Sequence, residues 1–399
     1  METATLCPDS PLQGLLDKRE SADNISECLT CGICNSRCTW YDGEGGPVPR
    51  QMIRMAQMGL DDALGNSRMI WDCMICNHCT VECPMGIVME HVVRRARSLP
   101  SAKKNMPATI AQGLETRLEM GDVNGFTRED FVETIEWLNE EIEDENPDAI
   151  IPTDQKGAKY LYLPNPRELG TNVLHLQLMA ALFHAFGEPW TMSHRHTDVT
   201  NWGYFIGDDD MERKMLAQVV EAAEELEVAN LVLSECGHGF LTLRHHVEEL
   251  LGRKPGFKVI SIIELTLEMV KRGVIKLDKE AHPFAIGYHD PCNLGRKAGV
   301  FDAPRELLAH TCREVVELVP NRMNAVCCGG GGALLQDGTS KDRRMIAGKA
   351  KVDQIRESGV DYIATGCLSC HRQLTELSKH YKLGTRVETV VATAAAALV

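Results

Sequence analysis

The sequence predicts an α+β multidomain fold, in which a helical N-terminal domain precedes two copies of one α/β unit with mostly parallel sheet. Three observations support this prediction. Two cysteine runs flank a helical pattern within residues 1–104. Short apolar segments alternate with helical patterns from Ala158 onward, which is typical of parallel α/β sheets. Segments of residues 158–280 also recur in the same order within residues 281–399.

Composition places the chain among globular proteins with metal sites. It has 399 residues, of which 44% are hydrophobic, and 16 are cysteines. Because the N-terminus shows no secretory signal pattern, we expect the grouped cysteines to bind metal in a reducing compartment. The apolar run at residues 389–399 is shorter than the roughly 20 residues that a membrane span needs. A net charge of −15 argues against a nucleic-acid partner.

Charge is concentrated in two segments. Residues 129–148 are densely acidic, and residues 91–104 contain Arg94, Arg95, Arg97 and two lysines. We expect each segment to form a solvated helix face, with a docking surface as the alternative.

The N-terminal domain contains two cysteine runs that share the spacing CxxCxxCxxxC. Pro84 follows the second run, whereas Thr39 follows the first. This spacing matches bacterial two-cluster ferredoxins, in which the fourth cysteine of each run ligates the other cluster. Thiolates suit iron because they are soft, anionic donors. The runs consist of Cys28, Cys31, Cys34 and Cys38, and of Cys73, Cys76, Cys79 and Cys83.

Crossed ligation of this kind predicts two [4Fe–4S] cubane clusters. The first would be held by Cys28, Cys31, Cys34 and Cys83, and the second by Cys73, Cys76, Cys79 and Cys38. A helical pattern separates the runs, with Pro49 at its start, Gly59 near its end and Leu60 as its last residue. We therefore expect a helical ferredoxin domain. Two zinc sites are the alternative, although zinc motifs rarely repeat four such thiols twice.

The remaining elements follow in order. Residues 105–157 are predicted to form a helical, acidic connector that closes with Pro147 and Pro152. Short apolar runs then predict strands at 159–163, 230–234, 258–261, 285–288, 315–318 and 362–365. Helical periodicity predicts helices at 172–186, 211–226, 240–251, 341–357 and 368–379.

The α/β half repeats internally. Residues 158–170 align with 284–296, residues 229–236 with 360–367, and the strand–helix segment 259–267 with 386–394. Five cysteines of the second copy thereby gain counterparts in the first. In the alignment Cys292 corresponds to Pro166, Cys327 to Asn201, Cys328 to Trp202, Cys367 to Cys236 and Cys370 to Gly239. Only the second copy therefore keeps all five thiols.

Each of these five cysteines follows a predicted strand, where parallel α/β sheets form their ligand crevice. Adjacent Cys327 and Cys328 cannot easily chelate one iron, so they favour a multi-iron site that is more open than a cube. The glycines from Gly329 to Gly332 would let the backbone approach a cluster and donate N–H groups to sulfur. The alternatives are a plain turn or phosphate loop for the glycines, and buried structural cysteines with one disulfide for the thiols. No Lys-Ser or Lys-Thr follows, so a Walker loop is not supported.

These motifs resemble a known family. The pattern Cys-x34-Cys-Cys-Gly-x37-Cys-x2-Cys resembles the cysteine-rich CCG domain of heterodisulfide reductases. A helical two-cluster domain before two CCG units resembles the D subunit of heterodisulfide reductase and the DsrK, TmcB and HmcF iron–sulfur subunits. It also resembles the C subunit of anaerobic glycerol-3-phosphate dehydrogenase. The resemblance implies a degenerate CCG domain at 158–280 and an intact one at 281–399.

In that family an intact CCG motif carries a noncubane [4Fe–4S] cluster, which holds substrate sulfur while a disulfide is cleaved in two one-electron steps. The matching ligands are Cys292, Cys327, Cys328, Cys367 and Cys370. Because the first copy is degraded, the chain is more similar to relatives with one catalytic cluster, such as the DsrK-like group. Three clusters of four irons predict about 12 irons per chain.

The resemblance implies an oxidoreductase subunit of a membrane complex in anaerobic respiration. Electrons would pass through the cubane clusters to the noncubane cluster, which reduces a disulfide or oxidises a dithiol. Implied partners are a membrane cytochrome b or quinone-binding subunit, further iron–sulfur or cytochrome c subunits, and a disulfide substrate or small thiol carrier protein. We expect a cytoplasmic chain, held peripherally at the membrane by a partner subunit.

Two other functions are weighed against this one. A non-catalytic relay between a flavin dehydrogenase and quinone is implied by the glycerol-3-phosphate dehydrogenase resemblance. A redox-sensing regulator is disfavoured, since the sequence shows no DNA-binding motif.

Several further side chains are candidates for supporting roles. His289 and His371 lie near predicted ligands and could move protons, although each could equally be structural. His194, His196 and His238 fall on loops of the first copy that could face the same cleft. The three remaining cysteines are assigned to a tail, to a possible cleft-lining or substrate-reactive thiol, and to the core; they are Cys7, Cys236 and Cys312.

Overall fold

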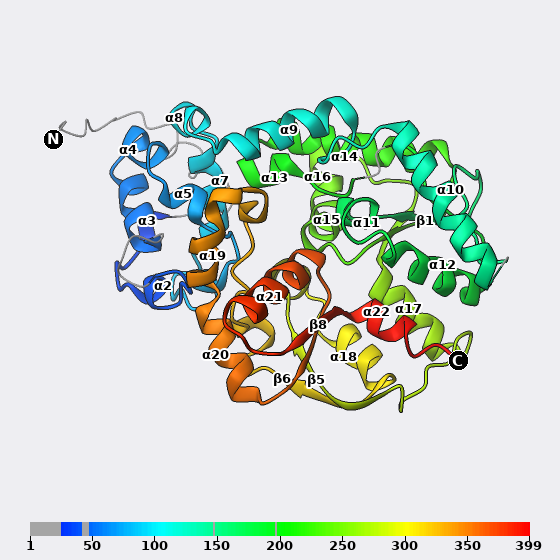
Figure 1. The fold of residues 1–399 in the computed structure, drawn as a ribbon. Coiled ribbons are helices and arrows are strands. Elements are labelled where there is room, and N and C mark those ends of the chain that lie inside the picture. The colour runs from blue at the N-terminus through cyan, green and yellow to red at the C-terminus, as the bar shows by residue number, and fades with distance from the viewer. Residues whose placement is uncertain (1–24, 42–47, 147, 196–197) are drawn as a thin grey trace.

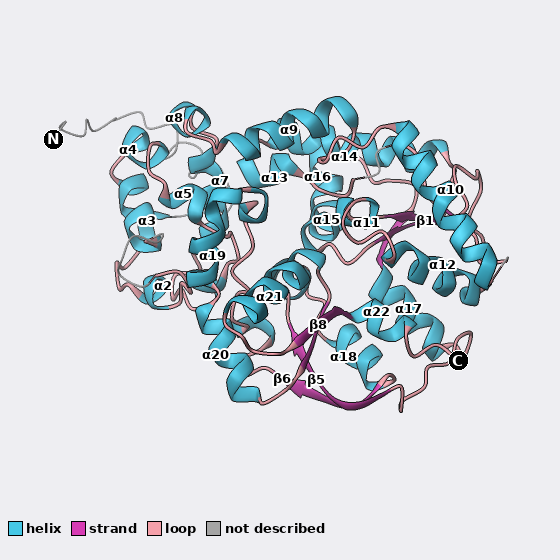
Figure 2. Cartoon of the chain, viewed as in Figure 1, coloured by secondary structure: helices cyan, strands magenta, loops and turns pink. Residues whose placement is uncertain are grey.

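The computed structural model describes residues 25–41, 48–146, 148–195 and 198–399, and its fold is shown in Figures 1 and 2. All elements described before residue 105 are helical and short. The predicted helix at residues 49–60 is α3 (Pro49–Gln57), which ends before Gly59 adopts a positive φ of 63°. The other elements are η2 (Ile25–Glu27), α2 (Ile33–Ser36), α4 (Asp61–Gly65), α5 (Met69–Asp72), α6 (His78–Val81), α7 (Met89–Arg97) and α8 (Pro100–Lys104).

The predicted connector consists of two longer helices, α9 (Ala108–Met120) and α10 (Arg128–Glu145). Thr127 and Asp130 form a capping box that fixes the start of α10. Phe131, Ile135, Leu138 and Ile142 of α10 belong to the core of the first copy, so the acidic segment is an amphipathic helix with one buried face.

Two four-stranded parallel sheets follow, and they share one strand order. The first runs β2-β1-β3-β4 and the second β6-β5-β7-β8, so each later strand takes the place of its counterpart. The predicted fold class, a helical domain followed by α/β units with parallel sheet, is confirmed. The strands are β1 (Tyr160–Leu163), β2 (Trp190–Thr191), β3 (Asn230–Leu233), β4 (Lys258–Ser261), β5 (His282–His289), β6 (Cys312–Glu317), β7 (Tyr362–Thr365) and β8 (Arg386–Thr389).

Helices cover both sheets, with two differences from the predicted boundaries. The predicted helix at 240–251 is a helical run whose middle turn, Thr242–His246, is π-helical. The predicted helix at 341–357 is divided at Gly348. The helices are α11 (Pro166–Leu169), α12 (His175–Phe186), α13 (Trp202–Ile206), α14 (Asp209–Glu225), α15 (Gly237–Leu241), α16 (Val247–Leu251), α17 (Ile262–Lys271), α18 (Asp302–Ala309), α19 (Lys341–Ala347), α20 (Lys349–Ser358), α21 (Leu368–His380) and α22 (Val390–Ala395).

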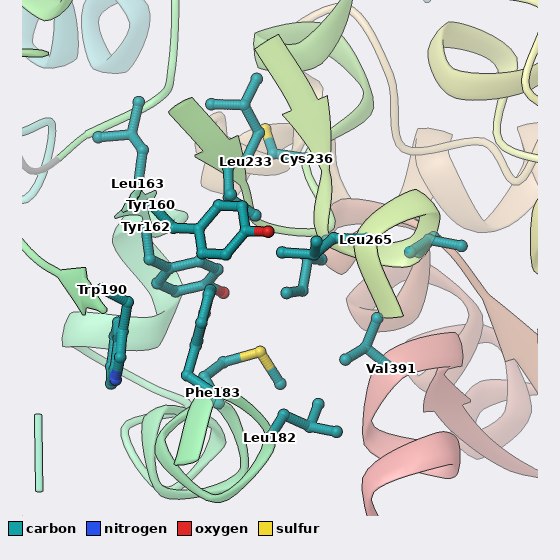
Figure 3. Packing of buried hydrophobic residues seen from close by; sticks show 14 of the residues in the cluster. Tyr160, Tyr162, Leu163, Leu182, Phe183, Trp190, Leu233, Cys236, Leu265 and Val391 are labelled. Atoms are coloured by element: carbon teal, nitrogen blue, oxygen red, sulfur yellow. The ribbon is translucent and has the colours of Figure 1, made fainter. Parts of the chain in front are cut away.

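The largest core cluster joins the two α/β copies. Figure 3 shows Phe183 and Trp190 beside the tyrosines of β1, and Val391 of α22 facing the same cluster. Phe183 and Trp190 stack with ring centroids 4.4 Å apart. Burying each such side chain contributes about 1.5–3 kcal/mol, so the copies stabilise one another through a continuous core.

In the basic segment Arg94 and Arg97 do not lie on a solvated face, contrary to the sequence-based expectation, whereas Lys103 and Lys104 are exposed. Arg97 is 0% exposed and donates hydrogen bonds to the carbonyls of Ile70, Cys73 and Phe205 at 2.6–2.9 Å. Arg94 is also buried and pairs with Glu212 of α14. These arginines are buried because they fasten the helical domain to the first α/β copy.

Among the described residues, none of the helices is both long enough and apolar enough to cross a membrane.

Candidate metal centres and the cavity between the sheets

The first centre is a cavity near the surface of the helical domain. It is lined by Cys28, Cys31, Cys34 and Cys83, together with Cys79. The backbone N–H of Thr30 lies 3.4 Å from Cys28 Sγ, as a hydrogen bond to a thiolate requires. Cys31 is exposed, and neighbouring Leu29 is 63% exposed.

The second centre lies deeper in the same domain. Its cavity is lined by Cys38, Cys73, Cys76 and Cys79, with Trp40 and Met74. The backbone N–H of Ile75 lies 3.4 Å from Cys73 Sγ. Helices α2 and α6 contact one another, which brings Cys38 to the second run and Cys83 to the first. The structure thus groups the eight thiols in the crossed arrangement that the spacing suggests.

The donor chemistry at these cavities fits a cationic cofactor. Burial, reinforced by neighbouring Cys73, raises the pKa of Cys38 to about 12. Burial likewise raises the pKa of Cys73 to about 11. Thiols in such surroundings keep their protons unless a metal replaces them, and four converging sulfurs suit an iron–sulfur cluster.

The third centre lies at the carboxyl edge of the second sheet. Cys292 begins the turn after β5, and Cys367 lies between β7 and α21. Four thiols line a cavity of about 70 Å³, and Cys328 Sγ lies 3.4 Å from Cys370 Sγ. The four are Cys292, Cys328, Cys367 and Cys370.

The fifth thiol, Cys327, points from the third centre toward the second. Its Sγ lies 3.5 Å from Met74 Sδ, and it packs in a cluster with Trp40, Met74 and Leu334. The neighbouring Cys327 thiol lowers the pKa of Cys76 to about 6. Cys327 therefore connects the two centres.

The glycine loop at residues 329–332 packs closely against the helical domain beside the third centre. A Cβ at Gly332 would overlap the carbonyl oxygen of Cys73, and one at Gly331 would lie 2.8 Å from that of Met74. Arg296, four residues after Cys292, donates a 2.8 Å hydrogen bond to the Cys76 carbonyl. Gly329 N–H lies 3.4 Å from Cys327 Sγ, as expected for a donor to sulfur. The contact with the helical domain was not predicted.

The first copy supplies the opposite wall of the third cavity. Pro166 and Trp202, which stand where the second copy has Cys292 and Cys328, both line it. Trp202 is 1% exposed, and its indole lies beside Gly113 of α9. A Cβ at Gly239 would overlap the side chain of Val199, which leaves no room for a cysteine there. Side chains have thus replaced the missing ligands.

The candidate histidines are distributed unevenly around this cavity. A ring nitrogen of His289 lies within 4.8 Å of Cys328 and Cys370 Sγ, and neither ring nitrogen has a hydrogen-bond partner among the described residues. Burial lowers the pKa of His289, which keeps it neutral. His371 is turned toward β8, with its Nε2 3.2 Å from the carbonyl oxygen of Val387, and it does not line the cavity.

In the first copy only His238 reaches the cavity. His194 pairs with Asp154 and is not part of the lining, while His196 lies outside the described residues. The Asn201 N–H donates to His238 Nε2 at 3.4 Å, so Nδ1 carries the ring proton. Burial lowers the pKa of His238 to about 3.

The three leftover cysteines occupy different surroundings. Cys236 is buried behind His238, with its Sγ 3.4 Å from His238 Nδ1, and burial raises its pKa. Cys312 is buried at the start of β6. Cys7 lies outside the described residues.

Two cations near the third centre were missed by sequence reasoning. Arg167 of α11 lines the cavity. Lys351 of α20 is 1% exposed, and burial lowers its pKa to about 8 although Cys328 acts on it in the opposite sense. Periodicity places both on ordinary helical positions, so no sequence signal distinguishes them from surface cations.

Two family models match the chain in these same regions. One, described as a 4Fe-4S dicluster domain, matches residues 24–87. The other, described as a cysteine-rich CCG domain, matches residues 286–375.

Curated relatives are similar over most of the chain. The D subunit of dihydromethanophenazine:CoB–CoM heterodisulfide reductase from Methanosarcina barkeri is 24% identical, over 94% of both chains. EtfAB:quinone oxidoreductase of Syntrophomonas wolfei is 27% identical over 79% of this chain and 44% of its own. Hdr-like menaquinol oxidoreductase iron–sulfur subunit 2 of Archaeoglobus fulgidus is 22% identical over 89% of this chain and 76% of its own.

These similarities confirm the resemblance predicted from the cysteine motifs. The chain is an iron–sulfur oxidoreductase subunit similar to the D subunit of heterodisulfide reductase, with domains that indicate [4Fe–4S] clusters and electron transfer. Its relatives are subunits of multi-subunit redox complexes.

Proposed function

We propose that this chain is the catalytic iron–sulfur subunit of a membrane-associated redox complex and reduces a disulfide at the third centre. The balanced reaction takes one disulfide, two electrons and two protons to two thiols, and it runs in reverse for a dithiol. The observation that carries the proposal is the cavity in which four thiols of the second copy face a wall built by the first. A simple electron relay would not need such a wall.

The proposed cofactors are two cubane clusters with the crossed ligands described above and one noncubane [4Fe–4S] cluster. The noncubane cluster would be held by Cys292, Cys327, Cys328, Cys367 and Cys370. When bound, it supplies electrons and an iron that takes up substrate sulfur. Cys292 follows β5, Cys327 and Cys328 follow β6, and Cys367 and Cys370 follow β7, so all five lie beyond the carboxyl ends of parallel strands.

The packing of the three centres supports a linear electron route. Cys31 of the first centre is exposed, which suits exchange with a partner such as a cytochrome b or quinone-binding subunit. Cys79 lines both cavities of the helical domain and so joins the first centre to the second. The contact of Cys327 with Met74 and Cys76 completes the route to the third.

Proton supply is assigned to a neutral histidine beside the cavity. His289 is not part of the lining, but a ring nitrogen lies within 4.8 Å of Cys328 and Cys370 Sγ. His238 lies on the opposite wall, but its Nε2 accepts from Asn201 N–H and its Nδ1 faces Cys236 Sγ, so it is assigned no proton transfer. His289 could pass a proton to a departing thiolate because a neutral imidazole both accepts and donates.

The proposal is tested by adding disulfides to the purified, reduced protein and recording the EPR signal of the third cluster. We expect that signal to change in shape, whereas the signals of the two cubane clusters only lose intensity as those clusters are oxidised. Cys236→Ala serves as a control, since it removes a buried thiol of the first copy and should keep the response. If no disulfide or dithiol alters the third signal, the chain is not a disulfide reductase.

A second candidate is a relay between a flavoprotein and quinone, and the similarity to EtfAB:quinone oxidoreductase favours it. In that case the third cluster passes electrons and binds no sulfur substrate. Reduction of the clusters by a flavoprotein, without any response to disulfides, would support the relay.

A further inference from the structure

We infer that Arg167, supplied by the degraded first copy, selects thiol and disulfide substrates that carry an anionic group near the reacting sulfur. This inference rests on the proposed function and adds the substrate's charge to it. It assigns the first copy a part in specificity, although that copy lacks four of the five candidate cluster ligands.

The charge of the cavity lining is the first support. Among the described residues that line the third cavity, Arg167 is the one formally charged side chain, and no aspartate or glutamate accompanies it. The rest of the lining consists of thiols, apolar side chains, glycines, one histidine and uncharged polar groups. The lining therefore offers an anionic group of a ligand one cationic side chain and no acidic side chain.

The missing partner of Arg167 is the second support. Within the described part of the chain, no carboxylate or other acceptor contacts its guanidinium. Glu376, the carboxylate whose charge acts on it, already pairs with Arg344 and Arg372 at 2.9 Å each. By contrast, the other arginines buried near the centres, such as Arg296 and Arg97, are bound to carbonyls.

Burial makes the missing partner costly. Arg167 is half-buried, and desolvation together with neighbouring Arg372 lowers its pKa to about 10, which leaves it charged at neutral pH. A partly desolvated cation without a counter-charge destabilises the site, and an anionic ligand would offset that cost. A guanidinium also binds carboxylate, phosphate or sulfonate oxygens through paired N–H groups.

A second unfilled polar position lies on the other side of the cavity. Asn293, next to Cys292, lines the cavity and has a buried Oδ1 that accepts no hydrogen bond among the described residues. A ligand whose sulfur lies at the thiols could therefore meet a donor at Arg167 and an acceptor at Asn293. The cavity is built for a polar small molecule.

The test compares two thiols of equal length, 3-mercaptopropionate and its uncharged amide, together with their symmetric disulfides. Each is titrated against the EPR signal of the third cluster in the full-length, cluster-loaded protein. Because a hydrogen bond to a charged group is strong, we expect the carboxylate to bind roughly 10- to 100-fold more tightly than the amide. Propionate, which lacks sulfur, shows whether the anion alone is recognised.

Matched variants assign the preference to one side chain. Arg167→Met should reduce the carboxylate-to-amide ratio to about 1, and Arg167→Lys should keep part of it. Arg372→Met removes an equal charge nearby but outside the lining, and should leave the ratio unchanged. Iron content of every variant verifies that the three clusters are present.

Each result bears on the inference. If Arg167→Met keeps the preference for carboxylate, the inference is overturned. The same holds if the variant shifts the midpoint potential of the third cluster and leaves the ratio at its wild-type value, because Arg167 then only balances cluster charge. A response to both thiols without any charge preference overturns the inference and leaves the proposed function standing. A lack of response to every thiol and disulfide overturns both.

Discussion

The two α/β copies share one sheet topology but differ in the residues at the candidate cluster positions. Both arrange four parallel strands in the same order. Both also have a glycine after the aligned residue pair, which is Gly203 in the first copy and Gly329, after Cys327 and Cys328, in the second. A Cβ at Gly203 would overlap the backbone of Glu212, and one at Gly329 would lie 2.9 Å from Gly348 N. The close backbone approach at this glycine is thus kept in both copies, although only the second copy retains the thiols.

A fold of this kind can lose the ligands of a metal centre and still keep its shape. In the first copy a buried tryptophan, Trp202, stands at the position aligned with Cys328, and Val199 fills the space beside Gly239 that a cysteine side chain would need. In the second copy the corresponding space is a cavity lined by sulfur. The second copy thereby supplies the thiols of the cavity, and the first copy supplies the side chains of the opposite wall.

The largest expected effect separates the copies by their metal content. Cys328→Ser should lower iron from about 12 to about 8 per chain, because the third cluster loses a central ligand. Cys236→Ala, in the first copy, should leave iron at about 12. Iron and acid-labile sulfide analysis of both variants measures this directly. A loss of iron in Cys236→Ala would mean that the ligands are wrongly assigned.

The next effect concerns the filled site of the first copy. Trp202→Cys restores the residue type that the second copy has at Cys328, but it leaves a hole where the indole was buried. We expect the free energy of unfolding to fall by about 3 kcal/mol, with no gain of iron. Denaturant unfolding under anaerobic conditions measures the change. Trp202→Phe, which leaves a smaller hole, should lower the free energy of unfolding by less. A gain of iron would show that the first copy is still able to hold a cluster.

A third difference lies one residue before the shared cysteine, where the first copy has Glu235 and the second has Gly366. Glu235 Oε1 accepts hydrogen bonds from Val390 and Val391 N–H at 2.9 and 3.2 Å, and so joins the copies. Burial raises its pKa from 4.5 to about 7. The folded chain therefore holds a proton that the unfolded chain releases between these two pH values.

Stability should consequently fall as pH rises from about 4.5 to about 7, by roughly 3 kcal/mol from this group. Glu235→Gln cannot titrate and should flatten that part of the pH profile. Unfolding midpoints measured across this range give the slope. An unchanged slope in the variant would remove Glu235 from the explanation.

The smallest expected effect tests the contact between the glycine loop and the helical domain. Gly332→Ala should destabilise the protein by about 1–3 kcal/mol, because Gly332 has a φ of 65° and its Cβ would overlap the Cys73 carbonyl. It should also slow electron transfer from the second centre to the third. Gly338→Ala is the matched control, since nothing lies within 4 Å of its added Cβ. Equal effects in the two variants would refute a role for this contact.

Local patterns predicted most of the fold. The strand–helix alternation and the internal alignment gave both sheets, because period and repeat are visible in the sequence. The two-residue strand β2 was missed, since Trp190–Thr191 is too short to show any alternation. The burial of Arg97 was also missed, because it depends on the carbonyls of residues far along the chain.

The candidate site divides in the same way. Cysteine spacing anticipated which thiols gather at each cavity. The turn of Cys327 toward Met74 and the unpartnered guanidinium of Arg167 could not be anticipated, because they arise where the helical domain and the two copies meet. Spacing along the chain carries no information on such contacts.

In the proposed mechanism, electrons held in the helical domain are delivered to a disulfide at the third cavity. Single-turnover freeze-quench EPR tests it most directly, by mixing the fully reduced protein with a disulfide and counting the thiols released. We predict that both cubane signals disappear as two thiols form for every two electrons lost, and that Cys328→Ser abolishes this reaction. Cubane clusters that stay reduced while the disulfide remains intact would contradict the account.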